Sequence, residues 1–393
     1  MGRTKKRKLT AWFSEHNSVQ LIKGGARYFE QLVELIESAR ETIHLQTYIY
    51  NDDETGREVG RALLAAVARD VQVYLLADGY ASRKMSPQFI AALKEGGVNF
   101  RFFEPLFRSR YFYFGRRLHH KLVVVDATRA MVGGINIGDH YNDRPERPGW
   151  LDFALLVQGE IARDLCILSC KTWRGFGRDK FVTPCGSASR LALKKEEEVL
   201  IRMRRNDWVN NKHQISRTYI EMMLNARSSI FILCSYFLPG TIIRKAIRRA
   251  SDRGVKITVI VAGKSDLLVA KNAEKYMYDW LLRNKVELYE YQRNILHGKM
   301  AVCDGEWLTL GSYNINDISA YASVELNLDV RNKQFAVNVE ETLQAIIKED
   351  CIPISEQVHR QSTNTFKQFF RWISYIVFRA LLFLFTFYLR PRR

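Results

Sequence analysis

One motif that occurs twice constrains this chain more than any other feature. Each copy has a His, a Lys two residues later and an Asp five residues after the Lys: His119, Lys121 and Asp126 in the first copy, and His297, Lys299 and Asp304 in the second. Each copy is followed at the same offset by a glycine-containing turn and an asparagine: Gly-Gly-Ile-Asn136 in the first, and Gly-Ser312-Tyr-Asn314 in the second. Such a pattern does not recur by chance, so we interpret it as one functional unit built twice.

Each copy is predicted to lie on a buried strand. Residues 122–125 and 300–303 are short apolar runs that contain Val, which favours strands over helices. Alternate residues of a strand share a face, so the His and Lys of each copy point the same way. The glycines fit a turn at which the backbone passes close to another group, and the asparagine beyond it can present its amide there. A single copy fits an ordinary strand with a satisfied histidine, but the pair indicates a function.

Two His and two Lys that converge on one pocket suit phosphodiester chemistry. One imidazole can attack phosphorus while the other, protonated, gives its proton to the departing oxygen. The two ammonium groups and two Asn amides would neutralise and orient the non-bridging oxygens. We therefore predict no metal and no cofactor. The six cysteines, at 166, 170, 185, 234, 303 and 351, form no Cys-x-x-Cys pair of the kind that is typical of zinc sites.

Two acidic residues are candidates for orienting the histidines. A nucleophilic histidine needs a carboxylate or carbonyl group on its far ring nitrogen, which fixes the tautomer and stabilises the imidazolium. Asp152, in Trp-Leu-Asp-Phe, and Glu325, in Ser-Val-Glu-Leu, lie at similar distances after the two motifs. Either could be a surface charge on a strand edge, but their matched placement favours the orienting role.

The paired motifs resemble the HKD signatures of the phospholipase D superfamily. Within it the chain is similar to bacterial cardiolipin synthases, in particular the shorter form without amino-terminal transmembrane helices. Gly-Gly-Ile-Asn-Ile-Gly-Asp-His-Tyr at 133–141 and Leu-His-Gly-Lys at 296–299 are typical of that branch. The resemblance covers roughly residues 17–350. It departs at Tyr313, where relatives often have Ser, a position that bears on acceptor specificity.

The resemblance implies a role for each of these residues. His119 would be the nucleophile that forms a phosphohistidine, and His297 would be the general acid and then the base. The phosphate would be held by two lysines, two asparagines and a serine: Lys121, Lys299, Asn136, Asn314 and Ser312. The motif aspartates, Asp126 and Asp304, would mostly support the local geometry. The carboxylates behind the two histidines would be Asp152 and Glu325.

Strand and helix patterns alternate along the chain and then repeat. Helical and extended stretches are predicted in turn at 25–40, 43–50, 54–69 and 71–77, and the same order returns at 219–226, 230–237, 241–252 and 255–262. With the resemblance, this predicts an α/β fold of two duplicated phospholipase D-like domains with mixed sheets, related by a pseudo-twofold axis, with the active site at their interface. We expect a basic arm at 1–16, domains at 17–185 and 186–350 with a junction within 175–194, and a membrane-associating segment at 351–393.

The net charge of +18 indicates an acidic partner, either nucleic acid or an anionic membrane. Residues 102–118 interleave aromatic and basic side chains directly before the first motif. This suits a lipid headgroup layer, stacking against single-stranded nucleic acid, or a partly buried loop. The basic residues within 3–8 fit a solvated arm or a membrane contact, and no long apolar run follows them as it would in a secretory signal.

The end of the chain favours the membrane as the partner. Residues 372–389 carry one charge, Arg379, and just reach the lower limit of a transmembrane span. Because a central arginine is costly in lipid, we predict a helix or hairpin in the interface rather than a true span, with a core helix docked on the second domain as a third alternative. We expect peripheral or tail-anchored attachment to the cytoplasmic face of the cell membrane. The scattered cysteines indicate a reducing setting, with Cys166 and Cys170 as core residues.

These features predict a membrane-associated phosphatidyltransferase. It would make cardiolipin from phosphatidylglycerol and a second phospholipid through a phosphatidyl-histidine intermediate. Its partners would be anionic phospholipids and a membrane surface, with no nucleic acid, and no oligomeric state is predicted. The alternatives are a phospholipase D-type hydrolase, a metal-independent nuclease, and a lipid-binding scaffold without catalysis. The basic charge permits a nuclease, but the apolar tail has no use in one.

Overall fold

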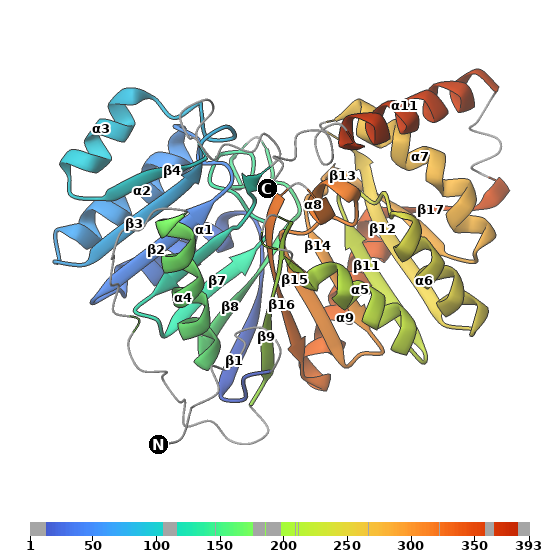
Figure 1. Cartoon of the computed structure of the whole chain (residues 1–393), viewed down its shortest axis with the longest axis horizontal. Helices are drawn as coiled ribbons and strands as arrows, with labels where there is room; N and C mark the ends of the chain where they lie inside the picture. The colour runs from blue at the N-terminus through green and yellow to red at the C-terminus, as the bar shows by residue number, and fades with distance from the viewer. Residues whose placement is uncertain are drawn as a thin grey trace.

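The computed structural model describes residues 13–104, 116–145, 147–175, 185, 198–208, 210, 212–265, 267–321, 323–357 and 365–383. They form two α/β lobes that lie side by side, one from each half of the chain (Figure 1). Each lobe is built around one sheet that mixes parallel and antiparallel strands. The duplication that the repeated motif predicts is therefore confirmed as two lobes of the same architecture.

The first sheet has seven strands in the order β1-β8-β7-β6-β2-β3-β4. Their bounds in that order are Asn17–Lys23, Phe153–Gly159, Arg129–Gly133, Leu122–Val125, Thr42–Thr47, Gln72–Asp78 and Asn99–Phe103. β2, β3 and β4 run parallel, and the other neighbouring pairs are antiparallel. The first motif runs into β6 at the middle of the sheet. Its Leu122 and Val124 face one core while Val123 and Val125 face another, as alternation along a strand requires.

Four helices accompany this sheet, and their bounds are α1 Ala26–Glu37, α2 Glu54–Val67, α3 Pro87–Glu95 and α4 Glu160–Arg174. α1 and α2 bury apolar residues on one face of the sheet, and α4 packs on the other. The start of α2 is capped by Asp53, whose side chain accepts the Gly56 N–H. The start of α3 is capped by Ser86, which is followed by Pro87 at the first helical position. The sequence therefore supplies both the apolar helix faces and the signals that begin the helices.

The second sheet has the strand order β10-β9-β16-β15-β14-β11-β12-β13-β17, with β5 added beside β16. The strand bounds in that order are Lys212–His213, Leu200–Asp207, Ser323–Arg331, Trp307–Gly311, Lys299–Cys303, Ser229–Cys234, Lys256–Lys264, Glu287–Ile295 and Cys351–Ile354, with β5 at Arg117–Leu118. Its helices are α5 Gln214–Asn225, α6 Thr241–Asp252, α7 Leu268–Arg283, α8 Asp317–Tyr321 and α9 Lys333–Asp350. β11, β12 and β13 are parallel, as are β2, β3 and β4 of the first lobe.

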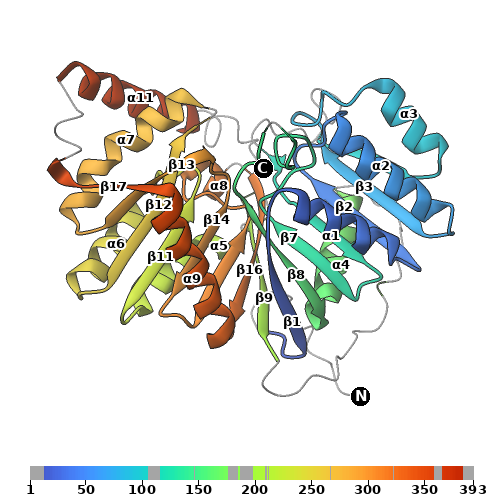
Figure 2. The same ribbon diagram turned by 180° about the vertical axis from the view of Figure 1, so that it is seen from behind.

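The two lobes share a central hydrophobic core. It joins α4 and β8 of the first lobe to β16 and α9 of the second, through residues such as Leu165, Leu155, Leu326 and Leu343. Figure 2 shows α9 lying across the second sheet on the side opposite α5 and α6. Each lobe also has an outer core of its own, beneath α1 and α2 in the first and beneath α5 and α6 in the second. The shared core holds the two sheets in a fixed relation.

Several boundaries differ from the predicted domain limits. The second sheet continues past residue 350, because β17 pairs with β13 in antiparallel register. The end of the predicted basic arm joins the second lobe, since Ser14 pairs with Ile201. By contrast, the helix predicted at 241–252 coincides with α6. Residues 1–12, most of the aromatic and basic stretch at 102–118 and most of the junction at 175–194 lie outside the described residues.

The prediction that the cysteines are reduced is wrong for one pair. Cys166 of α4 forms a disulfide with Cys185. The prediction that Cys166 and Cys170 are core residues is confirmed, because both are buried. Spacing along the sequence did not reveal the pair, since it depends on Cys185 lying against the buried face of α4, which only the folded chain shows.

The tail helix α11 spans Thr365–Phe383 and packs along α7. Arg371 is buried on the side that faces α7, and the Tyr375 ring lies 4.9 Å from the Tyr276 ring. Other side chains of the helix are exposed and apolar: Phe366, Phe369, Phe370, Trp372, Ile376 and Val377. Within the described part of the chain, no helix combines the length and apolarity that crossing a membrane requires. The last ten residues of the predicted membrane segment, 384–393, lie outside that part.

Candidate active site

The segment that leads into the first motif is hydrogen-bonded to the second lobe. β5 runs parallel to β16, and the His119 N–H donates to the Val324 carbonyl at 2.9 Å. This pairing brings the His119 ring beside the residue that follows Val324. The Nδ1 atom of His119 lies 2.8 Å from Oε2 of Glu325, whose side chain is fully buried. The first histidine therefore takes its carboxylate from the other lobe.

The second motif repeats this arrangement in the opposite direction. Leu296 forms a parallel bridge with Leu151, and the His297 N–H donates to the Leu151 carbonyl at 2.8 Å. The residue after Leu151 is Asp152, and its Oδ2 lies 2.6 Å from Nδ1 of His297. The two histidine–carboxylate pairs are thus exchanged between the lobes. Both carboxylates were identified from sequence, but their exchange was not, because matched offsets say nothing about which histidine each one reaches.

Both motif histidines line one cavity of about 370 Å³ at the junction of the lobes. Asn136 and Asn314, the asparagines predicted from the two turns, line it as well. Most of the other lining residues are aromatic, apolar or hydroxyl-bearing, with one arginine: Tyr48, Ile49, Arg117, Tyr141, Trp150, Tyr236, Leu267, Ala270, Asn316, Ser319, Ser323 and Glu325. The two copies of the motif therefore build one site together.

Burial sets the protonation of the histidines and their carboxylates. It lowers the pKa of His119, and with the nearby Lys299 ammonium it lowers the pKa of His297 to about 4. Burial alone would raise the pKa of Asp152 and Glu325, but the facing histidines and lysines outweigh it and hold both below the usual range. The carboxylates are therefore ionised at neutral pH while the histidines are neutral. A phosphodiester anion in the cavity would favour the imidazolium form.

The two motif lysines lie behind the histidines and are almost completely buried. Each folds back onto its own motif: Lys121 Nζ donates to the His119 carbonyl at 3.0 Å, and Lys299 Nζ donates to the His297 carbonyl. Burial lowers the pKa of Lys121 to about 7, and Lys299 adds to this effect. An anion close to Lys121 would raise this pKa again and favour the charged ammonium form.

The two asparagines are held by hydrogen bonds at the cavity wall. The Asn136 side chain accepts the Ile49 N–H and donates to the Tyr141 hydroxyl. The Asn314 side chain accepts the Ser235 hydroxyl at 2.8 Å. Both amides are therefore fixed in orientation before a ligand arrives, as a phosphate-orienting group should be.

Ser312 contacts the carboxylate behind His119. Its hydroxyl donates to Oε2 of Glu325 and accepts the Leu326 N–H. Among the described residues it is not one of those that line the cavity. In this position the Ser312 hydroxyl holds the carboxylate that contacts His119.

The motif aspartates support the fold at the far ends of their strands. Asp126 accepts three backbone N–H groups, those of Arg40, Glu41 and Thr42 at the start of β2. Asp304 accepts the corresponding N–H groups of residues 227–229 at the start of β11. Both aspartates have positive φ, near 50°, which places their carboxylates under the neighbouring strand. They are positioning residues that contact backbone, outside the cavity.

Replacing Asp126 with Ala is expected to lower the free energy of unfolding by about 2 to 4 kcal/mol, because three N–H groups lose a charged acceptor. Urea denaturation of the full chain measures this. Asp304→Ala is the matched variant in the second lobe and should behave alike, whereas Asn at either position should recover part of the loss. Lost activity with unchanged stability would contradict this supporting role.

Two tyrosines at the site were missed by the sequence analysis. Tyr48 follows β2 and Tyr236 follows β11, and both line the cavity. The Tyr48 ring lies 4.8 Å from the His119 ring in an edge-on arrangement. Aligning Thr47-Tyr48 with Ser235-Tyr236 in the two halves would have found the pair. The rings of Tyr141 and Trp150 lie 5.3 and 5.8 Å from that of His297, and both residues stand in stretches that the sequence analysis quoted without assigning them a role.

A known protein family matches both stretches of the chain that build this site. The family described as "Cardiolipin synthase, PLD-like domain" matches residues 32–145 and 219–347, more than half of the chain. The chain belongs to the phospholipase D-like cardiolipin synthase family. Each matched stretch contains one of the two motif histidines: the first includes His119 and the second includes His297.

Relatives of the family align along most of the chain. Cardiolipin synthase B of Escherichia coli (strain K12) is 32% identical over 346 residues, which cover 87% of this chain and 83% of the relative. Cardiolipin synthase B of Salmonella typhi is 33% identical over 351 residues, covering 88% and 84%. Phosphatidylserine synthase of Haemophilus influenzae Rd KW20 shares the fold, with a TM-score of 0.69 at 13% identity over 96% of each chain. This family member is therefore an enzyme of the phospholipase D superfamily.

Proposed function

We propose that this enzyme makes cardiolipin at a membrane surface by transferring a phosphatidyl group from phosphatidylglycerol to a second phospholipid. One observation carries the proposal: two histidines, each with its own buried carboxylate, line a single cavity. One ring can form a covalent bond to phosphorus while the other moves protons. The names of the curated relatives, cardiolipin synthases from several bacteria, support the choice of lipid.

The first step transfers the phosphatidyl group to the enzyme. Neutral His119 attacks phosphorus through Nε2, a nitrogen–phosphorus bond forms, and the bond from phosphorus to the headgroup glycerol breaks. The departing glycerol oxygen takes a proton from the His297 imidazolium, which the substrate anion has favoured. Glu325 stabilises the positive charge that develops on His119. Lys121, Lys299 and the two asparagine amides neutralise and orient the phosphate oxygens.

The second step transfers the group to the acceptor. His297, now neutral, removes a proton from the hydroxyl group of the second lipid, and that oxygen attacks phosphorus. The nitrogen–phosphorus bond breaks and returns His119 to its neutral form, while Asp152 stabilises protonated His297. Two molecules of phosphatidylglycerol thus give one cardiolipin and one glycerol. Water in place of the lipid hydroxyl would give phosphatidic acid, so transfer requires that lipid reaches the intermediate first.

The rim of the cavity favours lipid over water. Leu267 and Ala270, at the start of α7, line the cavity, and Leu268 and Val269 between them are exposed. Leu267, Leu268 and Val269 are consecutive and are 53%, 76% and 49% exposed, so they form a contiguous apolar patch at the rim. We propose that these side chains enter the lipid layer beside the site. The acyl chains of both substrates could then stay in the membrane while their headgroups reach the histidines.

The tail helix extends this apolar surface. Gln368 of α11 contacts Asp279 of α7, and Tyr375, two turns later, contacts Tyr276, so the two helices run antiparallel. α11 therefore advances towards the start of α7 and the cavity, as Figure 1 also shows. Its exposed aromatic side chains suit the headgroup boundary of a bilayer. We propose peripheral attachment through this face, and the cytoplasmic face of the membrane stays a prediction.

Leu268→Glu is expected to weaken binding to phosphatidylglycerol vesicles by about tenfold or more, because burying one leucine in an apolar layer contributes about 1.5 to 3 kcal/mol. Vesicle sedimentation of the full chain measures the bound fraction. Leu224→Glu on α5, another exposed leucine, is the matched control and should bind as the unaltered protein does. Equal weakening by both variants would reject this docking face.

The product assay tests the proposed reaction. The purified full chain is incubated with vesicles of phosphatidylglycerol, and the lipids are analysed by mass spectrometry with a glycerol assay in parallel. We expect cardiolipin and glycerol in equal amounts. Phosphatidic acid as the sole product would reject transfer in favour of phospholipase D-type hydrolysis, and degradation of single-stranded DNA without lipid turnover would favour a nuclease.

A further inference from the structure

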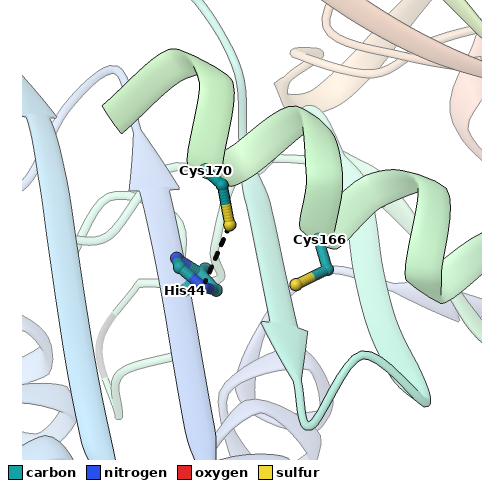
Figure 3. A group of neighbouring side chains, drawn as sticks. All are labelled: His44, Cys166 and Cys170. Atoms are coloured by element: carbon teal, nitrogen blue, oxygen red, sulfur yellow. Dashed lines mark hydrogen bonds between the residues drawn. The ribbon is translucent and has the colours of Figure 1, made fainter. Parts of the chain in front are cut away.

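Three cysteines and one histidine meet in the first lobe, outside the cavity described above. Cys166 and Cys170 lie one turn apart on the buried face of α4, and His44 faces them from β2 (Figure 3). The side-chain ligand atoms of these three residues all lie within 4.8 Å of one another. Cys185, which follows α4, is bonded to Cys166 and lies 3.6 Å from the Cys170 sulfur. Four soft or borderline ligands therefore surround one point.

Two distances within this cluster match the edges of a tetrahedral metal site, while the sulfurs of Cys166 and Cys185 are bonded and would have to separate. A zinc ion with bonds of about 2.3 Å to sulfur and about 2.0 Å to nitrogen separates its ligand atoms by about 3.5 to 3.8 Å. The Cys170 sulfur lies 3.6 Å from the sulfur of Cys185 and 3.7 Å from Nε2 of His44. Both separations are edges of such a tetrahedron. Three thiolates with one imidazole are one of the common ligand sets of structural zinc.

The ligands are held in place by the surrounding fold. His44 is 2% exposed, and its ring stacks on that of Tyr74 with 5.0 Å between centroids. Cys166 is fully buried and Cys170 nearly so. The next residue on the same face of β2, Gln46, donates to the Ser169 carbonyl of α4, so strand and helix are already joined beside the cluster. A rigid, buried frame of this kind suits a structural metal.

We propose that, when its thiols are reduced, the chain binds one Zn²⁺ through His44, Cys166, Cys170 and Cys185. A thiol reductant gives the disulfide two electrons and two protons and is itself oxidised to a disulfide, whereas a phosphine gives the two electrons and becomes the phosphine oxide, with the oxygen and the two protons coming from water. The three thiols release their protons to solvent as the metal binds. The Cys166 and Cys185 sulfurs then separate to tetrahedral spacing. The disulfide and the metal are alternative states of one cluster, and neither takes part in the phosphate chemistry.

Such a metal site would stabilise the part of the first lobe that positions His119. The metal would join α4 to β2, next to Gln46. Gln46 also contacts Nδ1 of His120, the neighbour of the His119 nucleophile. The sequence analysis did not predict this site, because His44 precedes Cys170 by 126 residues and the two α4 cysteines have the spacing of ordinary core residues. Only the fold brings the four ligands together.

Metal analysis of the full chain tests the proposal. The protein is reduced with a phosphine, given Zn²⁺, desalted and analysed by mass spectrometry for metal content. We expect about one zinc per chain, and a more than tenfold weaker affinity in both Cys170→Ser and His44→Gln. Cys351→Ser, a cysteine of β17 outside the cluster, is the matched control and should bind as the unaltered protein does.

A measurement without substitutions covers the case in which the variants do not fold. Co²⁺ added to the reduced, unaltered protein should give the visible absorption of a tetrahedral site together with thiolate-to-metal charge transfer. Absence of zinc from the reduced protein, absence of the cobalt spectrum, or full zinc binding in folded Cys170→Ser and His44→Gln would each overturn the proposal.

Discussion

Replacing His119 with Ala should lower kcat for phosphatidyl transfer by about 10⁴-fold or more, because it removes the proposed nucleophile that forms the covalent intermediate. His119 lines the cavity, is held by Glu325 at 2.8 Å, and is neutral when no ligand is bound because burial lowers its pKa. The mass-spectrometric product assay measures the loss. His16→Ala, a histidine paired with Glu198 outside the cavity, is the matched control and should keep normal turnover.

The order in which the histidines act can be tested with an activated substrate. A phosphatidyl ester of p-nitrophenol has a leaving group that needs no proton. With it, His297→Ala should release about one equivalent of nitrophenolate per chain and then stop, because the intermediate forms but no base activates the acceptor. His119→Ala should release none. The reverse pattern would assign the attack on phosphorus to His297.

Replacing Glu325 with Gln should lower kcat by about 10³-fold, because the carboxylate fixes the His119 tautomer and stabilises the imidazolium that develops. The effect should fall on kcat more than on KM, since Glu325 acts through His119. The pH profile gives a second readout. Burial lowers the pKa of His119 and Glu325 raises it, so removing the carboxylate should move the acid limb of kcat/KM to lower pH.

Two further variants test the role of Glu325. Asp152→Asn is the matched change behind His297 and should also lower kcat, although the residue lies in the other lobe. The double variant His119→Ala with Glu325→Gln should be no slower than His119→Ala alone, because the two residues act as a unit. Thermal unfolding checks that the buried amide is tolerated. Additive losses in the double variant would show that Glu325 acts independently of His119.

The repeated motif made much of this molecule predictable. His119 and His297 were expected to converge because each half carries one copy of the motif, and alternating apolar stretches predicted the α/β lobes. The exchange of carboxylates between the lobes could not be predicted from the sequence, since Glu325 lies 206 residues from the histidine that it contacts. The contact between Ser312 and Glu325 was not predicted for a related reason: a turn residue that could face a phosphate can equally face the carboxylate behind it. A strand as short as β17 carries too little pattern to predict its pairing.

The crossed histidine–carboxylate pairs limit how this enzyme can admit its substrates. Hinge opening between the lobes would pull His119 from Glu325 and His297 from Asp152 at once, and it would expose the core that α4 and α9 share. These contacts therefore oppose hinge motion between the two lobes. Without such an opening, headgroups would have to enter over the rim of the cavity, beside Leu267 and Ala270.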